Sequence, residues 1–420
     1  MNPFLCFSIF AVAGTPVLSV HGQPLAPAES PPQSTVIERI SLSANSAEFH
    51  HEPLATTEWT FHKNGDGSRP SGVEQQYVWL MNRARTNPEV EGIWLSLVRE
   101  NGVRSAINFF SVNLDIMRDE FEVISSNPPA AFDIRLHNAA LDHSNYLISI
   151  DGQNHNNQFQ RVTDAGFVYT SIGGSVFSYS RNGLYGHAGF NIDWGGNDGT
   201  GMQTGRGHRA GLMSSRANVG VGIALDNNGS TSVGPQVTTI NYANGSTFSA
   251  NHYNRFIVGT VWEDSNGNSF YDPGEGIGGV TVQPDSGDFY AITGDAGGYA
   301  VPVDPGSYVV TFSGGSLSSP VVKNVTVGTT SELIPWIEFS SVALLAEASL
   351  AIDTDAHEVD ASWEHVYGLP STVVVSDDMQ NWTVIDDSIS LSGSTFLWSD
   401  DWSDLTTKRF WRIQSWTYME

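Results

Sequence analysis

Residues 136–147 read LHNAALDHSNYL, and residues 154–156 read NHN after a short gap. Four residues of the first stretch recur at i, i+4, i+7 and i+11, the spacing of one helical face: Leu136, Ala140, His143 and Leu147. Asp151-Gly152 interrupts this periodicity. The stretch therefore predicts a helix that buries one face, with His155 in the polar loop that follows it.

Two later segments extend this pattern. Residues 205–213 read GRGHRAGLM, so His208 lies in a glycine-flanked segment that opens an apolar run. Residues 218–224 read NVGVGIA, in which valine and glycine alternate. Glycine inside a strand marks a place where another backbone approaches closely, so this strand is expected to pack directly against a neighbouring element.

A capping box opens the helix that begins this region. Ser71 is placed to cap the helix and Glu74 follows it by three residues, which is the spacing of the motif. Arg85 lies farther along the same helix. We expect its side chain to join the helix to the sheet through a carboxylate or through carbonyl oxygens.

Taken in order, these segments resemble a CAP domain, the family of cysteine-rich secretory proteins, antigen 5 and plant pathogenesis-related proteins, in a bacterial form without cysteine. The resemblance also uses residues 74–88 (EQQYVWLMNRARTNP) and Arg161 with Gly166-Phe167. It implies an α+β fold for residues 71–250, an α-β-α sandwich with a central cleft that contains two histidines and, usually, two glutamates. His155 and His208 match the two histidine positions.

The chain departs from the family at the glutamates. Where the family pattern reads Gly-Glu-Asn, this sequence has Gly173-Gly174-Ser175, so Gly174 replaces the first glutamate. Asp193 is the only carboxylate near the second position. The resemblance therefore implies a ligand-binding cleft with His155, His208 and Asp193, and no catalytic residue is assigned.

Zinc is the metal that the two cleft histidines would hold. Two imidazoles alone make a weak, open site, because stable zinc sites use three or four ligands. The alternative is a hydrogen-bonded pair of histidines without metal. With Gly174 in place of the first glutamate, the cleft also lacks an obvious general base.

The composition limits the partners of the protein. The chain has 420 residues, 42 of them glycine, and its charged fraction of 15% is below the roughly 25% usual for globular proteins. Its net charge of −26 repels phosphate backbones, which excludes nucleic acid as a partner class. The same charge attracts divalent cations.

Residues 1–22 resemble a secretory signal peptide. The apolar run at residues 4–13 is too short to span a membrane, and no other membrane span is predicted. Residues 23–70 are rich in Pro, Ser, Ala and Glu and are expected to form a linker. We therefore expect a secreted protein, extracellular or associated with the cell surface. Removal of the signal peptide removes the single cysteine, Cys6.

Residues 257–339 are predicted to form a calcium-binding β-sandwich. The segment DSNGNSFYDPGE at 264–275 has the ligand spacing of an EF-hand-type loop, although Ser269 stands where the motif has glycine. The predicted ligands are Asp264, Asn266, Asn268, the carbonyl of Phe270, Asp272 and Glu275. An Asx-turn-rich surface loop without metal is the alternative. Together with the β-branched runs that follow, this region resembles the B-type repeats of bacterial surface adhesins.

Residues 347–420 are predicted to form a second all-β sandwich, with Trp382, Trp398, Phe410 and Trp411 in its core. Residues 101–129 are an insertion relative to a plain CAP connection and are expected to form a helix or a lid.

Two functions from different classes fit this organisation. The first is a binding module, carried on calcium-stabilised β spacers, that captures a small or lipidic ligand, or an extracellular protein or polysaccharide. The second is a metal-assisted, peptidase-like hydrolase that acts in the cleft. The missing glutamate favours the binding module.

Overall fold

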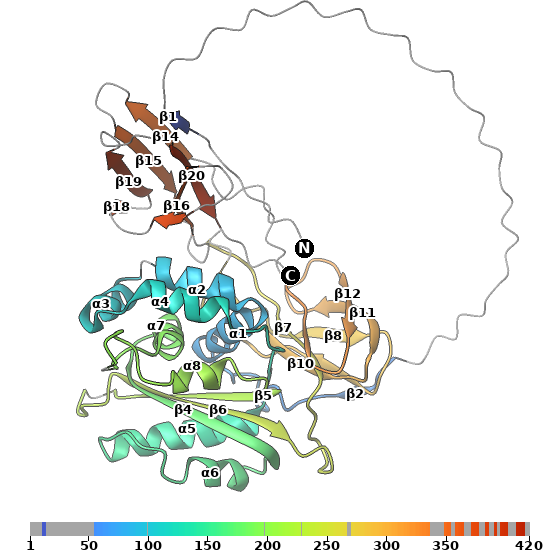
Figure 1. Ribbon diagram of the computed structural model, residues 1–420. Helices are drawn as coiled ribbons and strands as arrows, with labels where there is room; N and C mark the ends of the chain where they lie inside the picture. Colours follow the sequence, from blue (N-terminus) through green and yellow to red (C-terminus); the bar gives the residue numbers. More distant parts are fainter. Residues whose placement is uncertain are drawn as a thin grey trace, which may run out of the picture.

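The computed structural model describes most of the chain from residue 54 onward. The described residues are 11–13, 54–98, 100–196, 198–227, 229–266, 270–336, 348–353, 358–364, 371–377, 383–385, 390–392, 395–401 and 409–415. Within them, helices gather with one sheet and the remaining strands form further sheets (Figure 1). The fold is α+β followed by β-sandwich regions, as the sequence predicts.

A four-stranded sheet forms the centre of the helical part. Its strands are β3 (Ala131–Phe132), β5 (Asn218–Leu225), β6 (Gln236–Gly245) and β4 (Tyr169–Ser180), in that spatial order. β3 runs parallel to β5, whereas β5, β6 and β4 are antiparallel neighbours. β4 therefore forms one edge of this sheet.

Helices cover both faces of this sheet, which makes an α-β-α sandwich (Figure 1). On one face lie α5 (Ile134–Ser149) and α6 (Gln158–Asp164). On the other lie α1 (Gly72–Thr86), α7 (Gly183–Ala188), the π-helical turn η1 (Gly189–Asp193) and α8 (Gly207–Leu212).

The predicted helix at residues 136–147 is confirmed as the centre of α5, and the glycine strand is β5. Gly220 and Gly222 face this helix. A Cβ atom at Gly220 would lie 2.1 Å from the backbone nitrogen of His137, and one at Gly222 would lie 2.1 Å from that of Leu141. The close backbone approach that the sequence indicates is therefore present, since only glycine leaves room for α5.

The predicted capping box is confirmed at the start of α1. The backbone nitrogen of Glu74 donates to Ser71 Oγ, and the backbone nitrogen of Ser71 donates to Glu74 Oε2 at 2.8 Å. Arg85, near the end of α1, is fully buried and donates to the carbonyl oxygens of Leu212 and Arg216 at 2.6 and 2.9 Å. This arginine ties α1 to the segment between α8 and β5.

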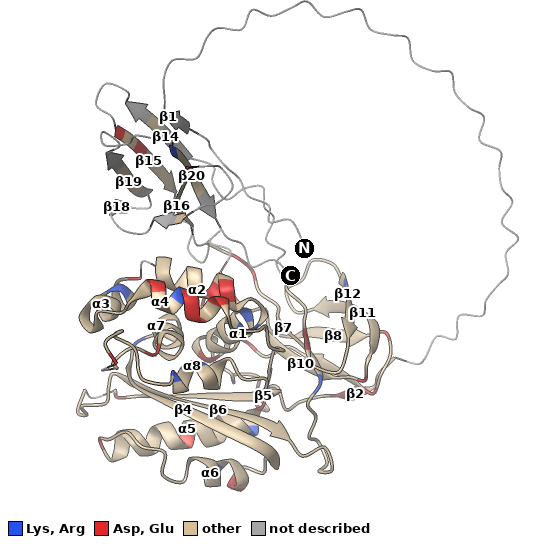
Figure 2. Ribbon diagram, in the orientation of Figure 1, with Lys and Arg blue, Asp and Glu red and all other residues tan. Residues whose placement is uncertain are grey.

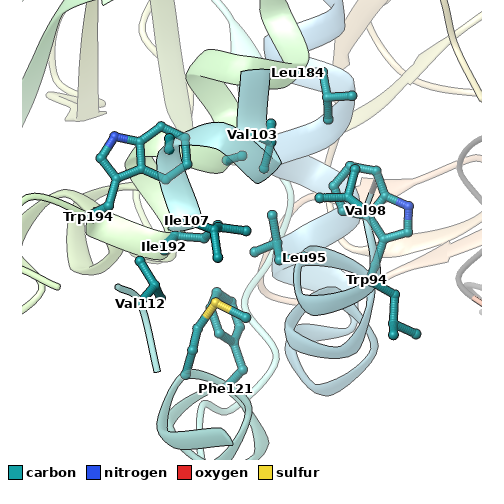
Figure 3. Close-up of a cluster of buried hydrophobic side chains, with 14 of the residues drawn as sticks. Trp94, Leu95, Val98, Val103, Ile107, Val112, Phe121, Leu184, Ile192 and Trp194 are labelled. Carbon is teal, nitrogen blue, oxygen red and sulfur yellow. The ribbon is translucent and has the colours of Figure 1, made fainter. Parts of the chain in front are cut away.

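Three helices follow α1 and enlarge the same face. They are α2 (Pro88–Leu97), α3 (Asn101–Phe110) and α4 (Leu114–Glu122), so the predicted insertion forms two helices, α3 and α4. Figure 3 shows the apolar cluster that joins them to α7 and η1. Leu95, Val103 and Phe121 are fully buried in it, which makes the insertion part of the core.

Residues 256–336 form two sheets that enclose a second core. One sheet contains β10 (Gly298–Pro302), β7 (Phe256–Thr260) and β13 (Glu332–Leu333). The other has the order β12 (Val321–Val327), β11 (Gly306–Gly314), β8 (Val280–Pro284), β9 (Phe289–Ile292) and β2 (Thr57–Glu58). Apolar residues of both sheets, Ile257 and Val310 among them, share one buried cluster.

The predicted linker at 23–70 overlaps the described residues only from residue 54. This part pairs with the β-sandwich, because β2 lies parallel to β9 with Thr57 opposite Phe289. Trp59 is 3% exposed and packs against Phe256 and Phe289. Residues 54–70 are therefore folded onto the second core.

The last described strands form two four-stranded sheets. One has the order β14 (Ala348–Asp353), β15 (Glu358–Glu364), β19 (Thr395–Asp401) and β18 (Ser390–Ser392). The other has the order β1 (Ala11–Ala13), β20 (Arg409–Ser415), β16 (Ser371–Ser376) and β17 (Thr383–Ile385). Of the aromatic side chains predicted for this core, Trp398, Phe410 and Trp411 are buried. Trp382 lies outside the described residues.

β1 lies inside the predicted signal peptide, of which only residues 11–13 are described, so the signal peptide stays a prediction. Among the helices of the described part, none is both long and apolar enough to cross a membrane.

Candidate functional site

A cavity of about 510 Å³ opens beside the edge strand β4, between α3 of the insertion and the turn from α7 to α8. Its size falls in the range of small-molecule sites, roughly 300–1,000 Å³. Seven aromatic residues line it: Phe109, Phe110, Phe177, Tyr179, Tyr185, Phe190 and Trp194. The polar side chains that join them are Ser105, Gln153, Ser178, Arg181, Gln203 and His208.

The strongest polar feature of the cavity is the pair formed by His208 and Asp193. His208 Nδ1 lies 2.7 Å from Asp193 Oδ1, and the backbone nitrogen of His208 donates to Asp193 Oδ2 at 3.0 Å. Asp193 is completely buried, whereas the His208 side chain is 25% exposed. Since Nδ1 donates to the carboxylate, Nε2 is the ring nitrogen available to the cavity.

Local backbone geometry brings this pair together. Asp193 ends the π-helical turn η1 and has a left-handed backbone, with φ of 58°. Arg206, which precedes α8, is also left-handed, with φ of 48°. Left-handed backbone is uncommon outside glycine and occurs where surrounding contacts enforce it, often at functional sites.

In the structure, His155 bonds a residue that does not line this cavity. His155 lies in the connection between α5 and α6, where its Nδ1 is 2.7 Å from Gln158 Oε1. Gln158 Nε2 donates in turn to Asn241 Oδ1 at 2.9 Å. His208 belongs to α8 on the opposite face of the sheet, and His155 is absent from the residues that line the cavity. Of the three predicted cleft residues, only His208 and Asp193 are in contact.

The space beside Gly174, where a side chain would lie, is filled by another residue. A Cβ atom at this position would lie 2.2 Å from Gln158 Nε2, so the amide of Gln158 fills the space that a glutamate would need. The next residue, Ser175, accepts a hydrogen bond from the Tyr242 hydroxyl at 3.1 Å on the α8 side. Burial raises the pKa of Tyr242, so this hydroxyl is a proton donor at neutral pH.

The sequence did not predict a buried charged cluster formed by Glu91, Arg83 and His187. Glu91 accepts from Arg83 Nε at 3.1 Å and contacts His187 Nε2 at 2.7 Å, and all three side chains are buried. Burial lowers the pKa of His187 despite the neighbouring carboxylate. Arg83 and Glu91 lie on different helices, so periodicity within one helix gave no sign of their pairing.

The aromatic walls that α3 contributes were also missed as site residues. Phe109 and Phe110 meet edge to face with ring centroids 4.9 Å apart. Phe109 lines the cavity and is 80% exposed, which is unusual for a large apolar side chain. That repeated aromatic pair within the insertion was the one available signal.

The predicted calcium loop is described except for residues 267–269, so Asn268 lies outside the described residues. Glu275 closes the loop: its Oε1 accepts from the Ser265 backbone nitrogen at 3.1 Å and its Oε2 from that of Asp272 at 2.9 Å. Asn266 Nδ2 donates to Asp272 Oδ2 at 2.9 Å. No group of three or more potential metal-binding His, Cys, Asp or Glu residues occurs in the described residues, and calcium and zinc stay predictions.

Phe270 and Tyr271 anchor this loop to the helical part of the molecule. The Phe270 ring is buried and stacks on Trp94 with centroids 5.9 Å apart, while Trp79 meets it edge-on at 5.0 Å. Gln76 Nε2 donates to the Tyr271 carbonyl at 3.0 Å. The loop therefore belongs to the contact between the α-β-α sandwich and the β-sandwich.

Comparison with known proteins adds little to this geometry. No protein-family model and no curated protein matches the chain. An extracellular protein containing an SCP domain, from Bacillus anthracis, is similar in structure with 16% identity and a TM-score of 0.22, over 33% of this chain and 39% of that chain. A DUF3823 family protein from Bacteroides ovatus is similar with 14% identity and a TM-score of 0.15, over 39% of this chain and 91% of that chain.

Proposed function

We propose that the protein is a secreted CAP-like binding protein whose aromatic cavity captures a small apolar or lipidic ligand. The observation that carries the proposal is the cavity of about 510 Å³ with seven aromatic lining residues and one oriented histidine. Apolar walls supply the affinity, and a few fixed polar groups orient the ligand. His208 Nε2 is such a group, since Asp193 sets the ring position.

A cavity-filling substitution tests the proposal. N-phenyl-1-naphthylamine, a neutral apolar probe that fluoresces in apolar surroundings, is titrated into the full chain. Ser105 lines the cavity from α3, so Ser105→Trp should weaken binding by at least about tenfold, or about 1.4 kcal/mol. Asn108 is exposed on the same helix away from the lining, so Asn108→Trp is the control. Unsaturable binding, or equal binding by the Ser105 variant, contradicts the proposal.

A hydrolase in the same cavity is the second candidate. The pair of His208 and Asp193 favours it, because a histidine oriented by a carboxylate is able to take a proton from water or from a substrate. The metal-assisted form has weaker support: His208 and a carboxylate already bonded to it fall short of the three or four ligands of a stable zinc site. If the pure protein cleaves peptides and His208→Gln abolishes this cleavage, the hydrolase replaces the binding module as the proposed function. If a chelator also abolishes the cleavage, the zinc proposal is supported.

The calcium proposal concerns the loop at 264–275. Its support is the ligand spacing in the sequence and the inward fold of Glu275, which is 8% exposed. Millimolar calcium should raise the melting temperature of the full chain, because it binds the folded state. Glu275→Gln should remove this response, whereas Asp288→Asn, outside the loop, should keep it. Equal melting with calcium and with chelator overturns the proposal.

Location and partners complete the proposed function. The calcium-stabilised β-sandwich would hold the binding module in an extracellular or cell-surface setting. The same setting makes an extracellular protein or polysaccharide a possible partner class. A secretion assay with and without residues 1–22 tests the location, since retention of both forms in the cell contradicts it.

A further inference from the structure

Glu120, on the inserted helix α4, contacts the two arginines on either side of His208. Glu120 Oε1 accepts from Arg206 Nη2 at 2.9 Å, and Oε2 accepts from Arg206 Nε at 3.1 Å. The same Oε2 accepts from Arg209 Nη1. One carboxylate therefore bridges residues 206 and 209, with His208 between them.

Arg209 extends this bridge to the other member of the pair. It is 3% exposed, and its Nε and Nη2 donate to the carbonyl oxygens of Asn191 and Ile192 at 2.5 and 3.2 Å. Asp193 follows these two residues directly. Glu120 is thus connected to His208 through the two arginines that flank it in the chain. It is connected to Asp193 through the Arg209 guanidinium, which bonds the two carbonyl groups before Asp193.

Arg206 is held from two directions. Its Nη1 donates to Asp198 Oδ2 at 2.7 Å, and Glu120 binds its other two nitrogens. Arginine has no freedom to rotate its planar fork within such a set of contacts. This fixation accompanies the left-handed backbone of Arg206, from which α8 starts without a side-chain cap of its own.

The charges of this cluster are too shielded to behave as ordinary surface ion pairs. The side chains of Glu120, Arg206 and Arg209 are 32%, 14% and 4% exposed. Exposed ion pairs contribute little because water and salt screen them, whereas one buried guanidinium left without its carboxylate is costly. Figure 2 marks the acidic residues of α4 in red and the basic residues of α8 in blue.

The insertion also touches this segment through its backbone. The backbone nitrogen of Asn113, between α3 and α4, donates to the Thr200 carbonyl at 2.8 Å. A Cβ atom at Gly201 would lie 2.4 Å from the Phe110 carbonyl oxygen, so the loop before α8 packs tightly on the end of α3. The helix that supplies the aromatic wall and the segment that supplies His208 are therefore joined.

We infer that Glu120 is a positioning residue for His208: it holds Arg206 and Arg209 so that the imidazole keeps its Nδ1–H on Asp193 and presents Nε2 to the cavity. The inference deepens the proposed function and rests on it for the role of His208. The insertion then has two tasks, since α3 forms a wall of the cavity and α4 orients its polar group.

The test is the tautomer of His208, read from its imidazole ¹⁵N chemical shifts and assigned by comparison with His208→Gln. The unchanged protein should show the Nδ1–H form. Glu120→Gln, which keeps the shape but removes the charge, should raise the other tautomer about fivefold, the factor that corresponds to one net hydrogen bond. Glu120→Ala should raise it further.

Asp115→Asn is the matched control, because Asp115 is on the same helix and pairs there with Arg118. It should leave the tautomer unchanged. An unchanged tautomer in Glu120→Gln at a normal melting temperature overturns the inference. Because this readout needs no ligand, a tautomer shift in a protein that binds no probe would refute the proposed function and keep the positioning role.

Discussion

At the scale of single residues, packing space decides what Gly174 can become. The Gln158 amide occupies the position next to its Cα, so a glutamate side chain has no room here. Gln158 is 1% exposed and also bonds Asn241, which prevents it from moving aside without loss. The absence of a side chain at Gly174 is therefore what leaves room for the buried amide of Gln158.

Gly174→Glu should consequently destabilise the protein and leave zinc affinity unimproved. Overpacking of a close-packed interior costs about 1–3 kcal/mol. Urea unfolding measures the loss, and calorimetry measures zinc. Gly328→Glu is the control, because nothing lies within 4 Å of a Cβ there. Tighter zinc binding in a stable Gly174 variant would show that the side chain finds another direction.

His62 makes the folded state sensitive to acid. It is fully buried beside β9, where its Nε2 donates to the Ile292 carbonyl at 2.8 Å. Burial lowers the pKa of His62 from 6.5 to about 4. The unfolded chain therefore binds a proton at a higher pH than the folded chain does, and the stability present above pH 6.5 is lost as the pH falls toward 4.

The free energy of unfolding should fall by about 3 kcal/mol across this pH range from His62 alone. His62→Gln retains a donor for Ile292 but does not titrate, so it should flatten the pH dependence. Urea unfolding at several pH values measures the slope. Buried His137 and His187 have pKa values lowered in the same direction, so some slope should remain. An identical slope in the variant would assign the effect to them alone.

At the scale of elements, the contact of α5 with β5 supports the α-β-α sandwich. Gly222 meets the Leu141 backbone nitrogen at a distance that no Cβ atom tolerates. The partner atom belongs to helix backbone, so no side chain is able to rotate away. The helix must shift if the glycine is replaced.

Gly222→Ala should therefore lower the free energy of unfolding by about 3 kcal/mol, the upper end of the cost of overpacking a core. Gly207→Ala serves as the control, because a Cβ there meets nothing within 4 Å. Chemical denaturation compares the two variants. Equal stability would mean that α5 slides over β5 at little cost.

At the scale of the whole molecule, Phe270 joins the β-sandwich to the helices. Its ring is surrounded by Trp79, Trp94 and the Arg83 guanidinium, which lies 5.3 Å from the ring centroid. The predicted calcium loop thus closes over a core that two parts of the chain share. The predicted β spacer is therefore packed directly against the α-β-α sandwich.

Phe270→Ala should separate the unfolding of the two parts. Truncating a buried phenylalanine costs about 3–5 kcal/mol, and here that cost falls on their contact. Calorimetry should show the transition of the α-β-α sandwich move away from that of the β-sandwich. Val309→Ala, at a half-exposed position on β11, should leave both transitions in place. If the variant loses stability but the two transitions stay together, the α-β-α sandwich and the β-sandwich unfold as one cooperative unit that includes Phe270.

The sequence by itself determined the elements that local pattern controls. The helix at 136–147, the capping box at Ser71 and the close-packed glycine strand all depend on spacings within a dozen residues, and each is present. The resemblance that these segments carry implied the α-β-α sandwich, and the β-branched runs after it indicated the β-sandwiches. Helical periodicity and backbone sterics act between residues close in the sequence, so their effects are predictable from the sequence.

Only the tertiary structure decided which side chains meet. His208 pairs with Asp193 because a π-helical turn and a left-handed Arg206 bring them together, whereas His155 bonds Gln158, only three residues farther along the chain. Glu91 meets His187 across 96 residues. Such pairings depend on how whole helices pack, and packing is set by the summed contacts of many residues far apart in the sequence.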